Sequence, residues 1–186
     1  MSDVKRSLLL CMLLVSFLVI PQVRVVSAQD GEDEPERERR GLVASLNGFQ
    51  EVPAVVSSGR GSFRARVRSD RTEIHYRLRY GRLEGEVTQA HIHIGQRGVN
   101  GGIAVLLCSN EDNSPAQACP MGEGEISGTV IAADILPISE QGVEGDEMVD
   151  LLRAIRAGAA YVNVHSSLFL DGEIRGQIRW LSRTDR

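Results

Sequence analysis

Apolar and polar residues alternate along most of the chain after residue 40. Successive side chains of a β-strand point to opposite faces, so a period of two predicts strands with one buried face. The clearest case is a hairpin of strands at 62–68 and 74–80, joined by a turn. Further strands are expected at 42–47, 88–94, 102–108, 125–132, 160–165 and 173–180. Many short strands and 19 glycines indicate an all-β sandwich or flattened barrel.

The segment 146–157 departs from this alternation and predicts one short helix. Four apolar residues fall at helical spacing in it, and Gly158 follows as a C-terminal cap. These four are Met148, Leu151, Leu152 and Ile155. Because an amphipathic helix usually packs its apolar side on a core, we expect a crossover helix on the sandwich.

Residues 1–28 have the pattern of a secretory signal peptide. Lys5 and Arg6 precede an apolar stretch at 7–20, and small residues near Ala28 suit cleavage. Arg24 leaves an uncleaved anchor open as the alternative. We therefore expect a secreted or periplasmic protein, with no stable membrane span once the signal is removed.

The chain after the signal peptide is expected to hold one folded domain. Residues 29–40 contain no hydrophobic residue, so they predict a disordered acidic spacer. A β domain at 41–182 follows, and its length suits a single core. Cys108 and Cys119, eleven apart in an exported chain, predict a structural disulfide that stabilises by about 3 kcal/mol. A metal or redox pair is the weaker alternative, because this spacing matches no common ligand pattern.

Three of the four histidines lie on predicted strands. His91 and His93 share one face of their strand, and Asn163 shares a face with His165. In the last strand, Glu173, Arg175 and Gln177 are spaced to lie on one face as well. If these strands are neighbours, imidazole, amide, carboxylate and guanidinium groups converge on one patch.

Several separated segments of the chain resemble the CHRD domain, the module first described in chordin. They occur in the family's order from about Leu42 to Trp180, and are Leu46–Pro53, Ala90–Gly95, Gly98–Gly101, Tyr161–His165 and Gly172–Gln177. The resemblance implies a β-rich extracellular domain, and it assigns no biochemical activity to the bacterial members of the family. The growth-factor binding of chordin itself is not carried over to a single domain.

A second resemblance concerns the histidine segment. Gly81–Gly85 followed by His91 and His93 resembles the copper/zinc superoxide dismutases, in which a Gly-Leu…Gly segment precedes a His-x-His pair on a β-sandwich. The resemblance stops at those residues, and from the predicted strands we expect an immunoglobulin-like or superoxide-dismutase-like sandwich or flattened barrel. Four histidines are too few for that enzyme's two metals, and His75 falls on the polar face of the hairpin. A single-metal site stays open.

Two interpretations of the patch follow from the residue types. In the first, His91, His93 and His165 bind one Cu or Zn ion, with an oxygen from Glu51 or Glu173. In the second, the patch is a buried polar network that orders the binding loops or contacts a partner. The network residues are Glu51, Asn100, Asn163, Arg175 and Gln177, with Glu173 pairing with Arg175.

Arginines gather on the polar face of the predicted hairpin. They are Arg64, Arg66, Arg68, Arg77 and Arg79. Their functional interpretation is a surface for an anionic polymer, and the alternative is pairing with local carboxylates such as Asp70, Glu73 and Glu84. Nucleic acid does not fit an exported chain with net charge −4 and no stacking aromatic residues on that face.

The sequence contains none of three common catalytic motifs. No Gly-x-Ser-x-Gly elbow is present, no carboxylate pair stands out for glycoside hydrolysis, and Lys5 is the only lysine, which excludes a phosphate-binding P-loop. We therefore predict a non-catalytic extracellular or periplasmic module that binds a protein or an anionic polymer. The alternative is a mononuclear Cu- or Zn-binding protein.

Overall fold

The computed structural model describes residues 41–181, so the predicted signal peptide and acidic spacer lie outside the described residues. The described residues form nine strands, one α-helix and three short 3-10 helices. The strands are β1 (Gly41–Asn47), β2 (Arg60–Val67), β3 (Ile74–Gly81), β4 (Val87–Ile94), β5 (Ile103–Ser109), β6 (Gly124–Val130), β7 (Ala160–Ser166), β8 (Ile174–Gln177) and β9 (Arg179–Trp180). The helices are η1 (Gly48–Gln50), η2 (Ala132–Asp134), η3 (Ser139–Gln141) and α2 (Met148–Arg156).

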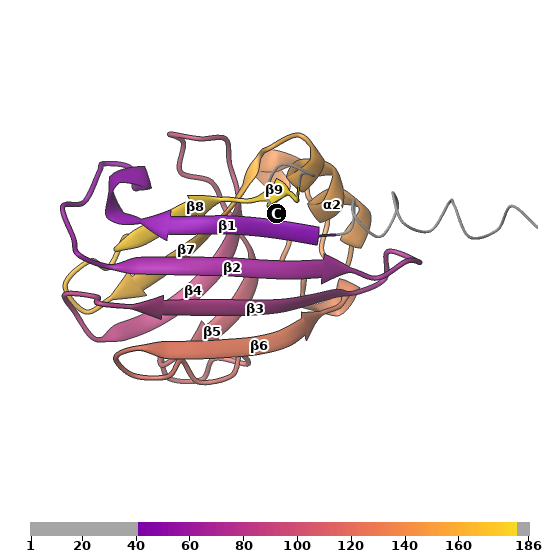
Figure 1. Ribbon diagram of the computed structural model, residues 1–186. Helices are drawn as coiled ribbons and strands as arrows, with labels where there is room; N and C mark the ends of the chain where they lie inside the picture. The colour runs from indigo at the N-terminus through magenta and orange to yellow at the C-terminus, as the bar shows by residue number, and fades with distance from the viewer. Residues whose placement is uncertain (1–40, 182–186) are drawn as a thin grey trace, which may run out of the picture.

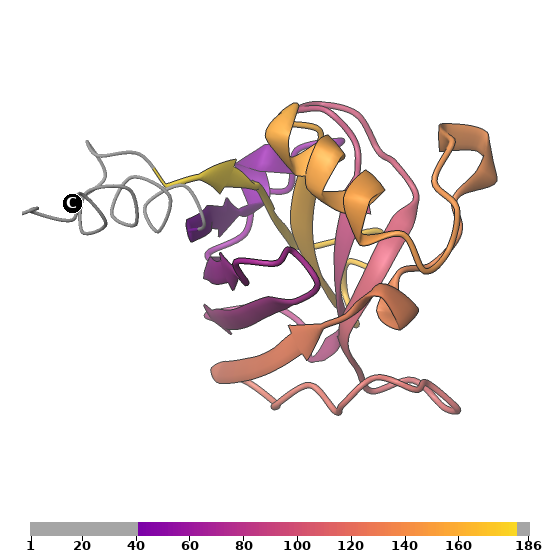
Figure 2. The same cartoon turned by 90° about the vertical axis from the view of Figure 1, so that its right-hand side faces the viewer.

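All nine strands join one antiparallel sheet that curls into a nearly closed barrel with two layers. The order is β5-β4-β7-β8-β1-β2-β3-β6, and β9 also pairs with β1. In Figure 1, β1, β2, β3 and β6 form the front layer, with β4, β5 and β7 behind it. The turned view in Figure 2 shows the same two layers with the helix at one end. The predicted all-β fold with sandwich or barrel character is confirmed.

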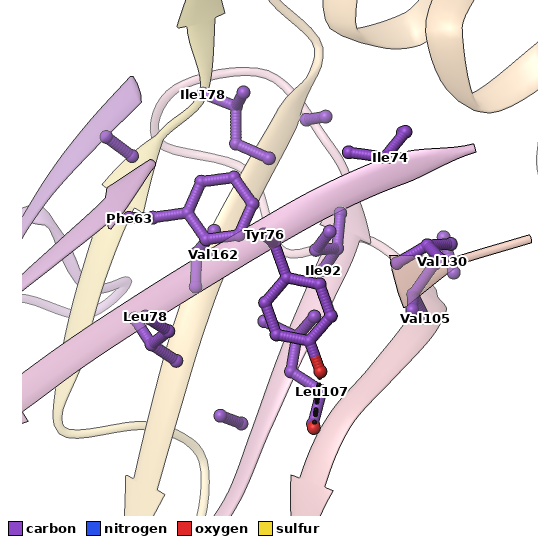
Figure 3. Packing of buried hydrophobic residues seen from close by; sticks show 14 of the residues in the cluster. Phe63, Ile74, Tyr76, Leu78, Ile92, Val105, Leu107, Val130, Val162 and Ile178 are labelled. Carbon is purple, nitrogen blue, oxygen red and sulfur yellow. Dashed lines mark hydrogen bonds between the residues drawn. The ribbon is translucent and has the colours of Figure 1, made fainter. Parts of the chain in front are cut away.

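The core fills the space between the two layers, because every strand contributes its apolar face. Phe63 and Leu78 are opposite each other in the β2–β3 hairpin and meet Ile92 and Val162 from the rear layer (Figure 3). The hydroxyl of Tyr76 lies in this core and donates a hydrogen bond of 3.0 Å to the carbonyl of Leu107. Full burial of one side chain such as Phe63, Leu78, Ile92 or Val162 stabilises the fold by about 1.5–3 kcal/mol.

Helix α2 has its apolar side on the sheet, as the spacing predicts. All four predicted residues, Met148, Leu151, Leu152 and Ile155, are buried. The helix begins two residues later than expected, because Asp146 has a φ of 64° and cannot be helical. None of the described helices is long and apolar enough to cross a membrane.

The last predicted strand is divided into β8 and β9. Strand β8 lies between β7 and β1, whereas β9 pairs with the start of β1 alone. Ile178 separates the two strands, and its amide donates to the carbonyl of Ala160. This break carries the segment from the rear layer to the front layer.

The predicted disulfide between Cys108 and Cys119 is confirmed. Cys108 lies near the end of β5, and Cys119 lies before β6, so the bond joins β5 to the segment that leads into β6. The side chain of Asn110 lies inside the loop and bonds the backbone of Val87 and Cys119. The loop is therefore tied to the start of β4 as well as closed by the disulfide.

Candidate metal centre

The three strand histidines lie together on the outer face of the rear layer. In the β4–β7 pair, His91 is opposite Asn163 and Gln89 is opposite His165. Ile92 and Val162 between them point into the core, which turns the histidines to the other face. The β4–β7 pairing therefore brings together two segments that are about seventy residues apart in the sequence.

The imidazole rings are close enough to share one ion. Their centroids are 5.4 Å apart for His91 and His93, 4.8 Å for His91 and His165, and 6.3 Å for His93 and His165. One nitrogen of each ring lies within 4.8 Å of one nitrogen of the other two. No carboxylate or thiolate of the described residues joins this group.

Two of the three rings have their tautomer fixed by a backbone carbonyl. Nδ1 of His93 is 3.0 Å from the carbonyl oxygen of Gly101, and Nδ1 of His165 is 2.8 Å from that of Leu170. A carbonyl oxygen only accepts, so each Nδ1 donates its hydrogen and each Nε2 keeps a free lone pair. Metal-ligating histidines are usually oriented in this way.

The remaining ring nitrogens are buried and have no hydrogen-bond partner among the described residues. These atoms are Nε2 of His93, Nε2 of His165 and both nitrogens of His91. His91 is 1% exposed and His93 is 7% exposed, so bulk water does not hydrate these groups. Buried polar atoms normally find partners, and these four unpartnered atoms lie together in one cluster.

Burial keeps the three rings neutral. Burial, with smaller contributions from the neighbouring His165 and His93, lowers the pKa of His91 to about 3. Burial also lowers the pKa of His93 to about 4 and is the main cause of the lowered pKa of His165. A neutral imidazole is the form that binds a metal, so no proton has to leave before an ion enters at pH 7.

An aromatic and a cationic side chain support the histidines from one side. The ring of Tyr161 stacks on His93 with centroids 4.7 Å apart, and the Arg175 guanidinium lies 3.4 Å from the centre of the Tyr161 ring. Arg175 also donates to Asn100 Oδ1 (3.0 Å) and to the carbonyl oxygens of Val99 (2.6 Å) and Gln96 (3.1 Å). It thereby fixes the β4–β5 loop, which carries the Gly101 carbonyl bonded to His93.

Polar side chains beside the histidines form hydrogen bonds with the surrounding loops. The side-chain amide of Asn163 donates to Glu51 Oε1 at 2.6 Å, and Gln177 donates to the carbonyls of Gly95 and Gly158. Asn100 donates to the carbonyl of Val52, which ties the β4–β5 loop to the segment after η1. Burial raises the pKa of Glu51 to about 7, although Arg175 and Asn163 act in the opposite direction.

Glu173 is placed elsewhere and is not a member of the histidine group. Its carboxylate accepts hydrogen bonds of 2.5 Å from the hydroxyls of Ser57 and Ser166, and of 2.7 Å and 3.4 Å from the amides of Glu84 and Gly85. The expectation that Glu173 shares a face with Arg175, and pairs with it, is therefore wrong. The pairing of β8 with β7 begins at Ile174, so the alternation of faces along β8 does not include Glu173.

Gly172 makes this turn sterically feasible. Its φ is +125°, and a Cβ there would lie 2.4 Å from Asn163 Nδ2 and 2.8 Å from Glu51 Oε1. A side chain at this position would therefore displace the Asn163–Glu51 pair beside the histidines.

The arginines lie far from this centre, on the exposed face of the front layer. Arg68 pairs with Asp70 and Glu73, as the local-carboxylate interpretation predicts, whereas Glu84 bonds Ser58 instead. Arg77 and Arg79 share Glu125 of β6, a partner that the hairpin sequence does not reveal. His75 also lies on this face, beside Thr129 and Glu73.

The sequence interpretation missed Tyr161 and the two carbonyls that orient His93 and His165. Tyr161 could have been found, because it alternates with Asn163 and His165 on one strand. The Gly101 and Leu170 carbonyls give no signal in the sequence, because backbone groups are the same at every residue.

The fold and the site define an all-β domain with three neutral, buried histidines on the outer face of one layer. The CHRD domain family model matches residues 42–178, and the chain therefore belongs to the CHRD domain family. No curated protein and no solved structure matches the chain.

Proposed function

We propose that this protein binds one copper or zinc ion through His91, His93 and His165. The observation that carries the proposal is the convergence of buried imidazole nitrogens that have no partner among the described residues. Imidazole nitrogen suits both metals, and three histidines are a frequent ligand set for them. The Gly101 and Leu170 carbonyls support the proposal, because they leave the Nε2 lone pairs of two rings free.

The ligand set would leave the ion with an open position. Within the described residues no Asp, Glu or Cys belongs to the group, and the carboxylate of Glu173 already accepts four hydrogen bonds. A three-histidine site with a free position accepts water or a ligand from a partner. The protein would thus act as an exported metal-binding module, and its disulfide agrees with an oxidising compartment.

A second candidate is a binding module that works without metal. It is favoured by the polar network, in which Asn163, Arg175 and Gln177 already have protein partners. This network orders three loops around the histidines and would present them to an extracellular protein. The metal-binding candidate requires the free imidazole nitrogens as ligands. The metal-free candidate does not, because the polar network does not use them.

Metal content separates the candidates. The protein is purified without an affinity tag and analysed by elemental mass spectrometry, beside His91→Ala/His93→Ala and the matched control His75→Ala, whose histidine is exposed. We expect about one Cu or Zn per chain in the wild type and in the control, and none in the double variant. A protein that is purified without metal and does not bind added Cu²⁺ or Zn²⁺ would favour the second candidate.

Chelation gives an independent measurement. Ligands that bind only the native state stabilise it by mass action, by about 2.7 kcal/mol when the free ligand is at about 100 times Kd. We therefore expect EDTA to lower the thermal midpoint of the loaded wild type and of His75→Ala. The midpoint of the double variant should not respond to EDTA.

A further inference from the structure

A second functional surface lies on the front layer, away from the histidines. We call it the arginine face and define it as Arg64, Arg66, Arg68, Arg77 and Arg79. All five side chains are exposed. Arg64 and Arg66 extend from β2, Arg77 and Arg79 extend from the neighbouring β3, and Arg68 directly follows β2. Figure 1 shows these two strands in the middle of the layer that faces the viewer.

The positive charge of this face is only partly neutralised. Asp70 and Glu73 pair with Arg68, and Glu125 is shared by Arg77 and Arg79. Arg64 and Arg66 form no hydrogen bond or ion pair with any residue of the described part of the chain. Arg64 is moreover directly opposite Arg77 in the ladder, a like-charge pairing that is unfavourable without a counter-charge.

A groove continues the face at one end of the strands. It has a volume of about 620 Å³, and its lining includes Arg60, Arg79, Tyr80, Arg82, Glu123 and Glu125. Arg79 therefore belongs both to the arginine face and to the groove. Together they form a basic strip along the strand direction.

We propose that the arginine face binds a linear anionic polymer through its carboxylate, sulfate or phosphate groups. Arginines two residues apart on a strand are about 6.7 Å apart, and neighbouring strands are separated by about 4.8 Å. Two parallel rows of guanidinium groups therefore match a chain of anionic groups better than one small anion. Each planar guanidinium can bond an oxyanion with two parallel N–H groups.

The apolar side of the same strands excludes a base-stacking partner. Phe63, Tyr76 and Tyr80 of β2 and β3 all point into the core, so the arginine face presents no aromatic platform. Electrostatic attraction is then the main source of affinity, and binding should weaken as salt is added.

The test uses the purified protein and three probes, which are long-chain polyphosphate, heparin and polygalacturonate. Binding is measured by calorimetry at low and high salt for wild type, Arg64→Ser/Arg66→Ser and the matched control Arg153→Ser/Arg156→Ser on α2. The two double variants lose the same charge, and within residues 41–181 Arg64 and Arg66 have no hydrogen bond or ion pair to lose. We expect at least one probe to bind the wild type and the control alike, and the first variant about tenfold more weakly. The probe that binds most tightly identifies whether the face prefers phosphate, sulfate or carboxylate groups.

Three results would overturn the proposal. One is an equal loss of affinity in both double variants, which would mean that binding depends on net charge alone. Another is a wild type that binds none of the probes at low salt. The third is binding that appears only after the acidic residues of segment 29–40 are changed to serine, which would make that segment the occupant of the face.

This inference stands apart from the metal proposal. The two sites lie on opposite layers of the sheet, so His91→Ala/His93→Ala should keep polymer binding unchanged. Failure of one proposal is therefore distinguishable from failure of the other.

Discussion

Replacing His91 with leucine should stabilise the metal-free protein. His91 is 1% exposed, and neither of its ring nitrogens has a partner among the described residues. The neutral ring thus buries one N–H donor and one lone pair, and each unsatisfied group costs about 1–3 kcal/mol. Leucine has a similar volume and no polar atom, so it removes this penalty without leaving a large cavity.

Taking the low end for each group, we expect a gain of about 2 kcal/mol in the free energy of unfolding. For a domain of this size, that gain raises the thermal midpoint by about 4–8 °C. The measurement is urea unfolding in EDTA at pH 7, followed by far-UV circular dichroism. In excess Cu²⁺ or Zn²⁺ the order should reverse, because only the wild type gains binding energy.

The matched control is His75→Leu on the exposed face of β3. His75 is exposed and forms polar contacts only with Thr129 and Glu73 among the described residues, so its replacement should change the free energy of unfolding by no more than about 0.5 kcal/mol. A His91→Leu protein that is less stable than the wild type in EDTA would refute the argument. It would mean that the ring nitrogens are satisfied in the metal-free state.

Four further predictions concern other buried and charged groups. Glu173→Gln should lower the free energy of unfolding by about 2–4 kcal/mol in urea, because four donors then face a neutral amide, whereas the exposed Glu86→Gln should change little. The metal-free protein should lose stability as the pH falls from 6.5 towards 4, by about 1.4 kcal/mol per pH unit for each histidine that stays neutral, because the unfolded state takes up those protons first. Glu51→Gln should steepen this loss in urea titrations at several pH values, because the raised pKa of Glu51 favours the folded state at acid pH; an unchanged slope would contradict that pKa. Arg64→Ser should stabilise by about 0.2–1 kcal/mol through relief of the Arg77 contact, whereas Arg79→Ser should not, because it loses Glu125; equal effects in thermal unfolding would count against this account.

Local periodicity was sufficient for most of the fold. The alternation at 62–68 and 74–80 predicts β2 and β3, because burial of one face follows directly from the pleat. Helical spacing likewise identifies the buried side of α2, and two cysteines in a chain that is expected to be exported predict the disulfide. For the site, periodicity placed His91 and His93 on one face of one strand.

The tertiary structure alone decided which distant groups meet. His165 joins the other two histidines only because β7 pairs with β4 in one register, and a register is set by non-local packing. The same holds for Glu125, which reaches two arginines because β6 lies beside β3.

The sequence by itself thus determined the strands, their buried faces and the residue types available for chemistry, since these depend on neighbours two to four positions away. Only the fold decided that Glu173 turns away from the histidines, that two backbone carbonyls fix their tautomers, and that four imidazole nitrogens have no partner among the described residues. Hydrogen-bond partners are a property of positions in space, and in a sheet built from distant strands such positions are not encoded by spacing along the chain.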